Sequence, residues 1–447
     1  MLKDRPLLKN TLIMTAVALA VRGIGIAFQS YITSVIGAEG VGLFALVQSA
    51  FTLALTFATS GIRYAVTRLI AEKSTLNPAE VAPTMRKAFA YACVCSVAAA
   101  LALYFGADLV ASHWIHDDRV AQPLRVMALG LPFIALTAVT GGYFSATWNV
   151  RANSASYIFD QVVMLAAVFL LLPRTHGGVA ESIIAIVTAN LISNAAGLAF
   201  GLVLYIHAKR GASFPDTPIG SVGKLSLSRG NSRDKATGKL VATAVPIALS
   251  AYFRTALNTV QHMLIPIGLR SSGLDASASL AAHGVLHGMV FPVLMFPSVL
   301  MVSAADLLIP ELTAAQVAGR NLKVHNIVTR ILKLSFAFSL GCAAVLFTFG
   351  GVIGRALYNS DQAGNYIRLL APLVVVMYMD MITDGLLKGL GQQLYSMYVN
   401  IADSAVSCLL VWQTLPIWGI KAYIFMIVAT ELFNFALSLH KLRTMLR

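Results

Sequence analysis

Long apolar runs alternate with short polar breaks along the whole chain. Each run holds about 20 or more residues, which is enough for a helix to cross roughly 30 Å of hydrocarbon. The runs lack the strict polar and apolar alternation of a membrane β-barrel strand, so the pattern predicts helices. We expect about twelve transmembrane helices, at residues 9–36, 42–71, 88–110, 122–147, 155–173, 181–208, 239–268, 281–310, 327–350, 365–390, 396–415 and 419–440.

The composition agrees with this pattern. Apolar residues make up 57% of the chain and charged residues only 12%, with a mean hydropathy of +0.76. Soluble domains carry about 25% charged residues, so a soluble protein is excluded. The first apolar run is longer than the core of a cleavable signal peptide and lacks a small-residue cleavage site. We therefore expect it to be retained as the first transmembrane helix.

The formal net charge of +14 comes from Lys and Arg residues in the polar breaks. They gather at the N-terminus, in every second loop and in the C-terminal tail, for example at Lys3, Lys73, Lys209, Lys323 and Arg447. Cytoplasmic loops carry the excess of Lys and Arg, so this placement predicts a multi-pass protein of the bacterial inner membrane with both termini in the cytoplasm. Because these charges are spread over many short loops, we expect no nucleic-acid partner.

A polar segment at 209–238 is rich in Ser, Gly, Lys and Arg, the composition of a flexible cytoplasmic connector. It separates an N-terminal six-helix lobe, 1–208, from a C-terminal six-helix lobe, 239–447. An even number of helices in each lobe makes the lobes parallel repeats, related by an axis along the membrane normal. The predicted fold is an all-α membrane protein with two six-helix bundles around a central cavity that can open to either side.

Three arginines lie inside the predicted helices: Arg22 and Arg254 at a similar depth in each lobe, and Arg63 nearer the cytoplasmic side. An arginine in the middle of a bilayer costs at least about 2.5 to 3.5 kcal/mol on insertion scales, so it normally faces protein or water. A guanidinium group binds phosphate in a bidentate fork. These residues predict a cationic cavity that receives a diphosphate; alternatively, each arginine pairs with a buried carboxylate or a helix-end carbonyl.

Acidic residues also occur within the predicted helices. Asp384 and Lys388 are four residues apart, which favours an ion pair along one helix face. Asp380 and Asp403, on neighbouring helices, are candidates for a coupling site for Na⁺ or H⁺. The remaining acidic residues in predicted helices include Asp160, Asp306 and Glu431.

His283 and His287 are also four residues apart on one predicted helix. This spacing suits a metal pair, but no third ligand stands nearby in sequence, so we expect no metal site. We assign the two histidines to substrate binding, with plain helix packing as the alternative. The four cysteines show no disulfide or metal-ligand pattern, and no nucleophile and base pair points to an enzyme.

Short segments in a characteristic order carry a family resemblance. They are residues 36–43 (IGAEGVGL), 61–69 (GIRYAVTRL), 264–266 (LIP), 283–289 (HGVLHGM), 308–312 (LIPEL), 387–391 (LKGLG) and 431–434 (ELFN). Over nearly the whole chain, this series resembles the stage V sporulation protein B group of polysaccharide transporters, in the multidrug/oligosaccharidyl-lipid/polysaccharide (MOP) flippase superfamily.

The resemblance implies a flippase that turns a polyprenyl-diphosphate-linked saccharide or peptidoglycan precursor across the cytoplasmic membrane, in polysaccharide, cell-wall or sporulation pathways. Its partners would be that lipid-linked oligosaccharide or cell-wall precursor and the membrane lipids. We expect a monomer without cofactors, coupled to Na⁺, H⁺ or the membrane potential. The chain departs from the family pattern in having about two helices fewer, Gly141 in place of an arginine, and Asp160 in place of a glutamate.

Two other functions remain open. A cation-coupled multidrug antiporter could share the fold, but its cavity should be acidic, whereas the deepest predicted charges here are arginines. A scaffold for cell-envelope synthesis that does not transport could use the basic connector at 209–238 to recruit enzymes.

Overall fold

A computed structural model describes residues 5–446, apart from 60, 64, 68, 71–79, 148, 176–177, 212–232, 302–311, 313–314 and 317. Side chains are described from residue 22 onward, except those of 150, 209–211 and 233–250. Within this part of the chain the regular structure is entirely helical. Asp306 and most of the predicted connector at 209–238 lie outside the described residues.

The chain begins with one long helix that a glycine divides into two arms. Helix α1 (Arg5–Thr59) is kinked at Gly37, whose φ of 68° and ψ of −179° lie outside the helical region. Side chains with a Cβ atom rarely adopt a positive φ, so glycine permits the kink. The two arms correspond to the predicted helices at 9–36 and 42–71. The second predicted helix is interrupted again at Gly61, with a φ of 68°.

The remaining helices of the N-terminal half pack against both arms of α1. They are α3 (Val81–Leu109), α4 (Ala121–Ala128), α5 (Leu131–Ala146), α6 (Val150–Leu171) and α7 (Val179–Gly211). Helices α4 and α5 meet at a bend of 41°. They form one broken span, which corresponds to the predicted helix at 122–147.

The C-terminal half contains α8 (Arg233–Ser271), α9 (Ala276–Gly284), the π-helical turn η5 (Val285–Val290), α10 (Phe291–Met295), α12 (Asn321–Tyr358), α13 (Asp361–Leu370), α14 (Leu373–Gly389), α15 (Gln393–Trp418) and α16 (Ile420–Leu446). Helices α13 and α14 are bent by 59° and form a second broken span. Eight described helices are long and apolar enough to cross a membrane, or up to ten if each bent pair is one span. With the two arms of α1 and the 39-residue α8, these elements confirm the all-α membrane fold of about twelve helices.

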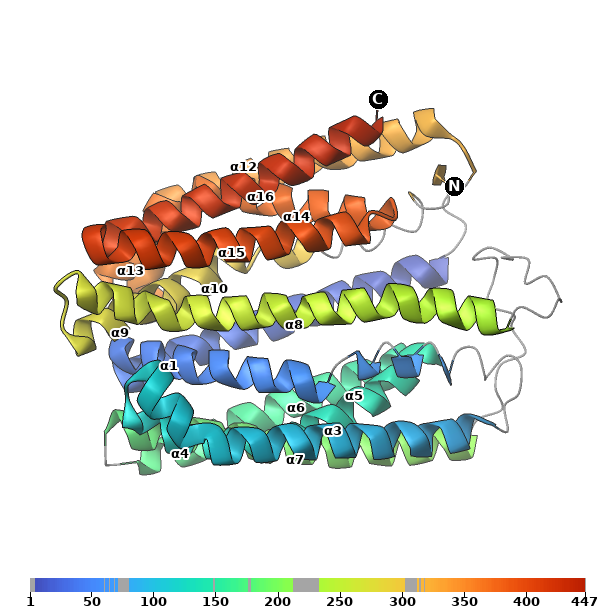
Figure 1. Cartoon of the computed structure of the whole chain (residues 1–447), viewed down its shortest axis with the longest axis horizontal. Coiled ribbons are helices and arrows are strands. Elements are labelled where there is room, and N and C mark those ends of the chain that lie inside the picture. Colours follow the sequence, from blue (N-terminus) through green and yellow to red (C-terminus); the bar gives the residue numbers. More distant parts are fainter. Residues whose placement is uncertain are drawn as a thin grey trace.

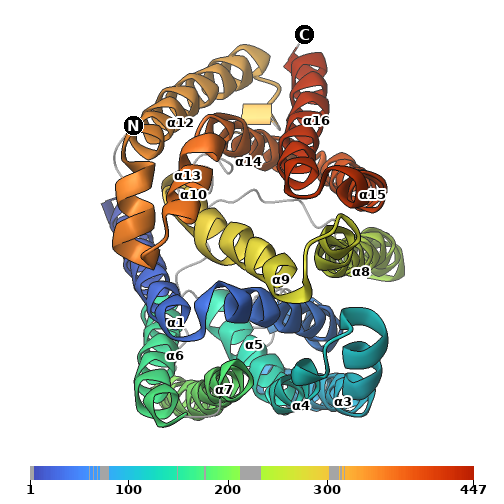
Figure 2. The same cartoon turned by 90° about the vertical axis from the view of Figure 1, so that its left-hand side faces the viewer.

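The helices run along the long axis of the molecule, and both chain termini lie at the same end (Figure 1). Viewed along that axis, α1 and α3 to α7 gather on one side and α8 to α16 on the other, with α1 and α9 meeting between them (Figure 2). One large apolar core lies within the C-terminal half and three smaller cores lie mainly within the N-terminal half. Met263 and Leu280 pack into an N-terminal core, so the two halves touch there.

Candidate functional site

A cavity of about 620 Å³ lies between the two halves, lined by both polar and apolar residues. We call it the polar cavity because charged and amide side chains face it. Arg22 lines it from the first arm of α1, and His287 lines it from the C-terminal half. Its other polar lining residues are Gln29, Tyr157 and Gln161. The structure therefore brings together two of the predicted site residues, Arg22 and His287, across the boundary between the halves.

A second cavity, of about 590 Å³, adjoins the first and is apolar. Ile26 of α1 lines both cavities, so it marks their common boundary. Val293 and Phe296 line the apolar cavity from the segment around α10, and Phe338 and Val345 line it from α12. A cationic polar chamber and an apolar chamber thus lie side by side along the first arm of α1.

A third cavity, of about 290 Å³, lies within the C-terminal half, and four carboxylates are among its lining residues, so we call it the acidic cavity. Asp380, Asp384, Asp403 and Glu431 line it together with Arg254. The structure therefore joins the predicted coupling pair, Asp380 and Asp403, in one chamber, and it adds Glu431, for which the sequence suggested no role. Met295 lines both this cavity and the Arg22 cavity, so the two chambers are neighbours.

The carboxylates of the acidic cavity differ in how their oxygens are satisfied. Lys388 Nζ contacts Asp384 Oδ2 at 2.5 Å, which confirms the predicted ion pair. The side-chain amide of Asn434 donates to Asp380 Oδ2 at 3.2 Å. By contrast, Asp380 Oδ1 and Asp403 Oδ1 are buried and have no hydrogen-bond partner among the described residues. These two free oxygens can accept a cation or a proton.

The three arginines do not share one chamber. Arg22 lies in the polar cavity, whereas Arg254 lies in the acidic one. Arg63 instead lies beside Gly141 of α5: a Cβ atom on Gly141 would stand 3.9 Å from the Arg63 Cζ atom. The glycine that departs from the family pattern thus lies next to the Arg63 guanidinium group, with an added Cβ atom at ordinary van der Waals distance. None of the three arginines forms an ion pair with a described carboxylate.

Asp160, the second departure from the family pattern, is held by a neighbouring helix. The hydroxyl of Ser193, on α7, contacts Asp160 Oδ1 at 2.5 Å. Gly197 lies one turn further along α7, where a Cβ atom would meet the same carboxylate oxygen at 3.1 Å. These contacts join Asp160 to the packing of α6 against α7; Asp160 does not line the three cavities, although its neighbour Gln161 lines the Arg22 cavity.

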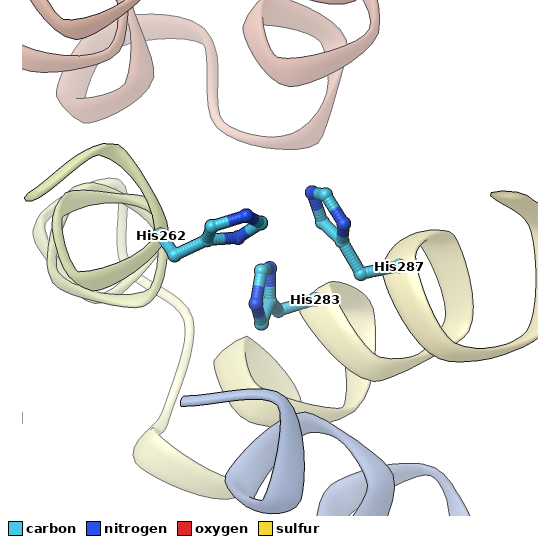
Figure 3. Close-up of side chains that lie close together, drawn as sticks. All are labelled: His262, His283 and His287. Atoms are coloured by element: carbon cyan, nitrogen blue, oxygen red, sulfur yellow. The ribbon is translucent and has the colours of Figure 1, made fainter. Parts of the chain in front are cut away.

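His283 and His287 have a third histidine beside them that the sequence did not reveal. His262, on α8, places its ring centroid 4.3 Å from that of His287 and 5.6 Å from that of His283. The three rings face a common space between α8 and the α9–η5 segment (Figure 3). His262 precedes His283 by 21 positions on a separate helix, so no spacing pattern could have linked them.

Polar contacts join the two halves beside the start of α9, a helix that lies at the end of the molecule opposite the termini (Figure 1). Arg119 Nη1 contacts Glu39 Oε1 at 3.0 Å, and the Ser277 hydroxyl, from the C-terminal half, donates to Glu39 Oε2 at 2.7 Å. Arg119 also contacts Asp117 Oδ2 at 2.7 Å. Burial raises the pKa of Asp117, but the hydrogen bonds from Arg119 outweigh this effect and leave that pKa below its ordinary value. The carboxylate therefore stays ionised at neutral pH and helps to position Arg119.

Sequence comparison assigns the chain to a family. The family model described as polysaccharide biosynthesis protein matches residues 7–316, more than half of the chain. The chain belongs to the polysaccharide biosynthesis protein family. A second model, MatE, matches residues 246–412 of this family member.

Curated relatives agree with this assignment. The family member is 24% identical to the stage V sporulation protein B of Bacillus subtilis over 376 residues, covering 83% of this chain and 70% of that protein. It is 23% identical to the lipid II flippase MurJ of Bacillus subtilis over 418 residues, covering 87% and 74% of the two chains. The expected resemblance to the stage V sporulation protein B group is confirmed.

The fold matches a solved transporter structure. The inward-facing conformation of a multidrug resistance MATE family transporter of the MOP superfamily superposes with a TM-score of 0.72, covering 97% of this chain and 98% of that chain. Sequence identity in this match is only 14%, so it establishes a common fold. The protein is a multi-pass membrane protein with the fold of MOP-superfamily transporters.

Proposed function

We propose that this protein moves a polyprenyl-diphosphate-linked saccharide or peptidoglycan precursor across the cytoplasmic membrane by alternating access. One observation carries the proposal: the polar cavity that holds Arg22 adjoins an apolar cavity along the same arm of α1. A lipid-linked sugar has the same division, with an anionic, hydrophilic head and a hydrocarbon tail. The relation to a lipid II flippase supports the same class of substrate.

Arg22 is expected to bind the diphosphate. A guanidinium group makes two parallel hydrogen bonds to phosphate oxygens, and such contacts gain strength where water is scarce. Gln29 and Gln161 line the same cavity and can donate amide hydrogens to sugar hydroxyls. Arg63 and Arg254 lie outside this cavity, so we assign them to other stages of the substrate's path.

The hydrocarbon tail needs no polar shelter. The apolar cavity between α1, α10 and α12 offers it a surface that continues from the head-binding chamber. Transfer of the tail into water would cost roughly 0.8 kcal/mol for each CH₂ group, so we infer that the tail stays in the bilayer or in this cavity while the head crosses.

We infer an orientation from the Lys and Arg distribution, with both termini in the cytoplasm. The contacts of Glu39 with Arg119 and Ser277 then close the outer side of the protein. Alternating access requires these contacts to open when the head is released, while the cytoplasmic side closes.

The acidic cavity is the proposed coupling site. Asp380 and Asp403 each present a buried oxygen without a partner, and Glu431 adds a third carboxylate to the same chamber. Unpaired carboxylates inside a membrane protein mark ion or proton pathways. We propose that Na⁺ or H⁺ binds here and favours one of the two conformations, with the membrane potential as a further driving force.

Transport in reconstituted vesicles tests the proposal. A fluorescent polyprenyl-diphosphate sugar is placed in both leaflets, and the fraction accessible to an external quencher or enzyme is followed over time. We expect Arg22→Ala to slow flipping at least tenfold, because a phosphate contact worth more than about 1.4 kcal/mol is lost. Arg22→Lys should restore only part of the rate, because lysine keeps the charge but loses the fork. Arg254→Ala should also slow flipping, through another stage of the path.

The matched control is Arg330→Ala, which removes an exposed arginine of α12 and should leave the flipping rate unchanged. An Arg22→Ala, Arg254→Ala double variant that flips as fast as the unchanged protein would remove the assigned role of these arginines. Wild-type vesicles that show no flipping above protein-free vesicles would remove the proposed function.

A second candidate is a cation-coupled antiporter of cationic drugs. The acidic cavity favours it, because four carboxylates face one chamber and only one arginine lines it with them. This function predicts that expression in an efflux-deficient host raises resistance to cationic dyes, and that the Asp403→Asn variant does not. A transport-free scaffold instead predicts that deletion of 212–232 abolishes envelope phenotypes while no protein variant affects flipping.

A further inference from the structure

The most unusual cluster in the described chain is a group of three histidines. Their candidate ligand nitrogens, from His262, His283 and His287, all lie within 4.8 Å of one another. Two come from the α9–η5 segment and one from α8, so the group joins two separate helices (Figure 3). The helix containing His283 turns into the π-helical η5 just before His287. Turns of this kind are frequently found at functional sites.

If the three histidines only packed together without a metal ion, their buried polar nitrogens would lower the stability of the folded protein. His262 Nδ1 and His283 Nε2 are buried and have no hydrogen-bond partner among the described residues. A buried polar group without a partner costs roughly 1 to 3 kcal/mol. A core that only needed to fill this space could use apolar residues. The unpartnered nitrogens facing one space therefore point to a ligand that accepts their lone pairs.

We propose that His262, His283 and His287 bind a divalent transition-metal ion, with Zn²⁺ as the expected ion. Neutral imidazole is a preferred ligand of Zn²⁺, Cu²⁺ and Ni²⁺, and three protein ligands with one open position are a common zinc arrangement. In a tetrahedral site with Zn–N distances of about 2.0 to 2.1 Å, the nitrogens stand about 3.3 Å apart. The present nitrogens lie within 4.8 Å of one another, so the rings must close by up to about 1.5 Å to reach that geometry.

The surroundings support a metal ligand role. The Tyr423 hydroxyl lies 3.4 Å from His283 Nδ1. If the imidazole donates its Nδ1 hydrogen to this oxygen, then Nε2, the nitrogen without a partner, is free to coordinate the ion. Tyr423 is itself completely buried, which holds the pair in place.

The Arg22 cavity provides access to the site. His287 lines that cavity, so an ion on the three histidines can be reached from the polar chamber. The fourth coordination position can then be taken by water or by an anionic oxygen from the chamber. The metal site does not depend on the proposed function, because ion binding can be measured without transport.

The experiment measures Zn²⁺ binding to the purified full-length protein in detergent. We expect about one tightly bound Zn²⁺ per chain after equilibrium dialysis. Each of His262→Gln, His283→Gln and His287→Gln should weaken binding at least tenfold, because loss of one of three protein ligands removes a large share of the affinity. The matched control is His325→Gln, an exposed histidine of α12, which should bind Zn²⁺ like the unchanged protein.

Co²⁺ binding can be measured by visible absorption in the unchanged protein, so this test does not depend on whether a variant folds. Bound by three imidazoles in a tetrahedral site, Co²⁺ should produce an intense visible absorption band in the unchanged protein, and excess Zn²⁺ should remove it. Zn²⁺ should also raise the melting temperature of the unchanged protein, since the assembled three-histidine site binds it more tightly than the unfolded chain does. Absence of the band together with dialysis binding that is unaffected by His262→Gln would overturn the proposal.

Discussion

Single charged residues inside the helices fall into two groups. Some are satisfied locally: Asp384 by Lys388, and Asp160 by Ser193. Others face cavities without an ion-pair partner among the described residues, as Arg22 does in the polar chamber. Because a charge in a bilayer needs a partner or water, the second group marks surfaces that face water, and these are the surfaces that the proposed substrate would use.

At this scale we predict the effect of removing one free carboxylate. Asp403→Asn keeps the shape of the side chain but removes its charge, so the acidic cavity should bind a cation or proton more weakly. We expect the stimulation of flipping by an imposed Na⁺ or H⁺ gradient to fall about tenfold or more. Vesicle transport with and without each gradient measures this.

The control for this prediction is Asp361→Asn. That carboxylate is 82% exposed at the start of α13 and contacts Arg355 at 3.6 Å, far from a buried environment. Its loss should leave the gradient response intact. An equal response in the unchanged protein, in Asp403→Asn and in Asp380→Asn would contradict a coupling role for the acidic cavity.

At the scale of elements, glycines allow α1 and α9 to touch backbone to backbone. A Cβ atom on Gly42 would stand 1.9 Å from the carbonyl oxygen of Leu280, and one on Gly284 would stand 2.1 Å from that of Ala38. These two helices come from different halves, so this backbone contact holds the two halves together near the kink at Gly37. Small residues at this crossing set the closest approach of the two halves.

We predict that Gly284→Ala weakens this contact. The added methyl group forces α9 away from α1, and overpacking of this kind costs about 1 to 3 kcal/mol. The melting temperature in detergent should fall. A thiol reagent should also label the Ser277→Cys cysteine faster when Gly284→Ala is present than when Gly284 is unchanged. Gly106→Ala, where nothing lies within 4 Å of the added atom, should show neither change. Equal melting temperatures for the two alanine variants would contradict the contact.

At the scale of the whole molecule, the two halves meet at one end through Glu39, Arg119 and Ser277. One cavity lies between the halves and another within the C-terminal half, and none of these three residues lines either cavity. A transporter of this fold works only if the contact can break, since the substrate head must leave on the opposite side.

A cross-link across this contact should therefore stop transport. We predict that Glu39→Cys with Ser277→Cys, joined by a short cleavable thiol cross-linker, loses nearly all flipping and recovers it after reduction. The four native cysteines are first replaced by serine. The control pair, Glu39→Cys with Arg119→Cys, joins two residues of the same half and should keep its activity. Full transport by the cross-linked Glu39 and Ser277 pair would rule out opening at this end.

The sequence by itself determined the class of structure. Lipid offers the backbone no hydrogen-bond partner, so only helices and closed β-barrels span it. The uninterrupted apolar runs lack the alternation of barrel strands and therefore predict helices. The ion pair of Asp384 with Lys388 was also readable, since residues four apart on a helix are neighbours whatever the fold. Motifs spread over the chain also indicated the relation to the stage V sporulation protein B group, and the comparisons confirm it.

Only the tertiary structure decided which distant residues share a chamber. It separated Arg22 from Arg254, gathered Glu431 with Asp380 and Asp403, and brought His262 to His283 and His287. Helical periodicity relates residues within one helix, whereas these groups depend on how helices cross, rotate and bend at Gly37 and η5. Those angles follow from packing across the whole bundle, which no local pattern in the chain records.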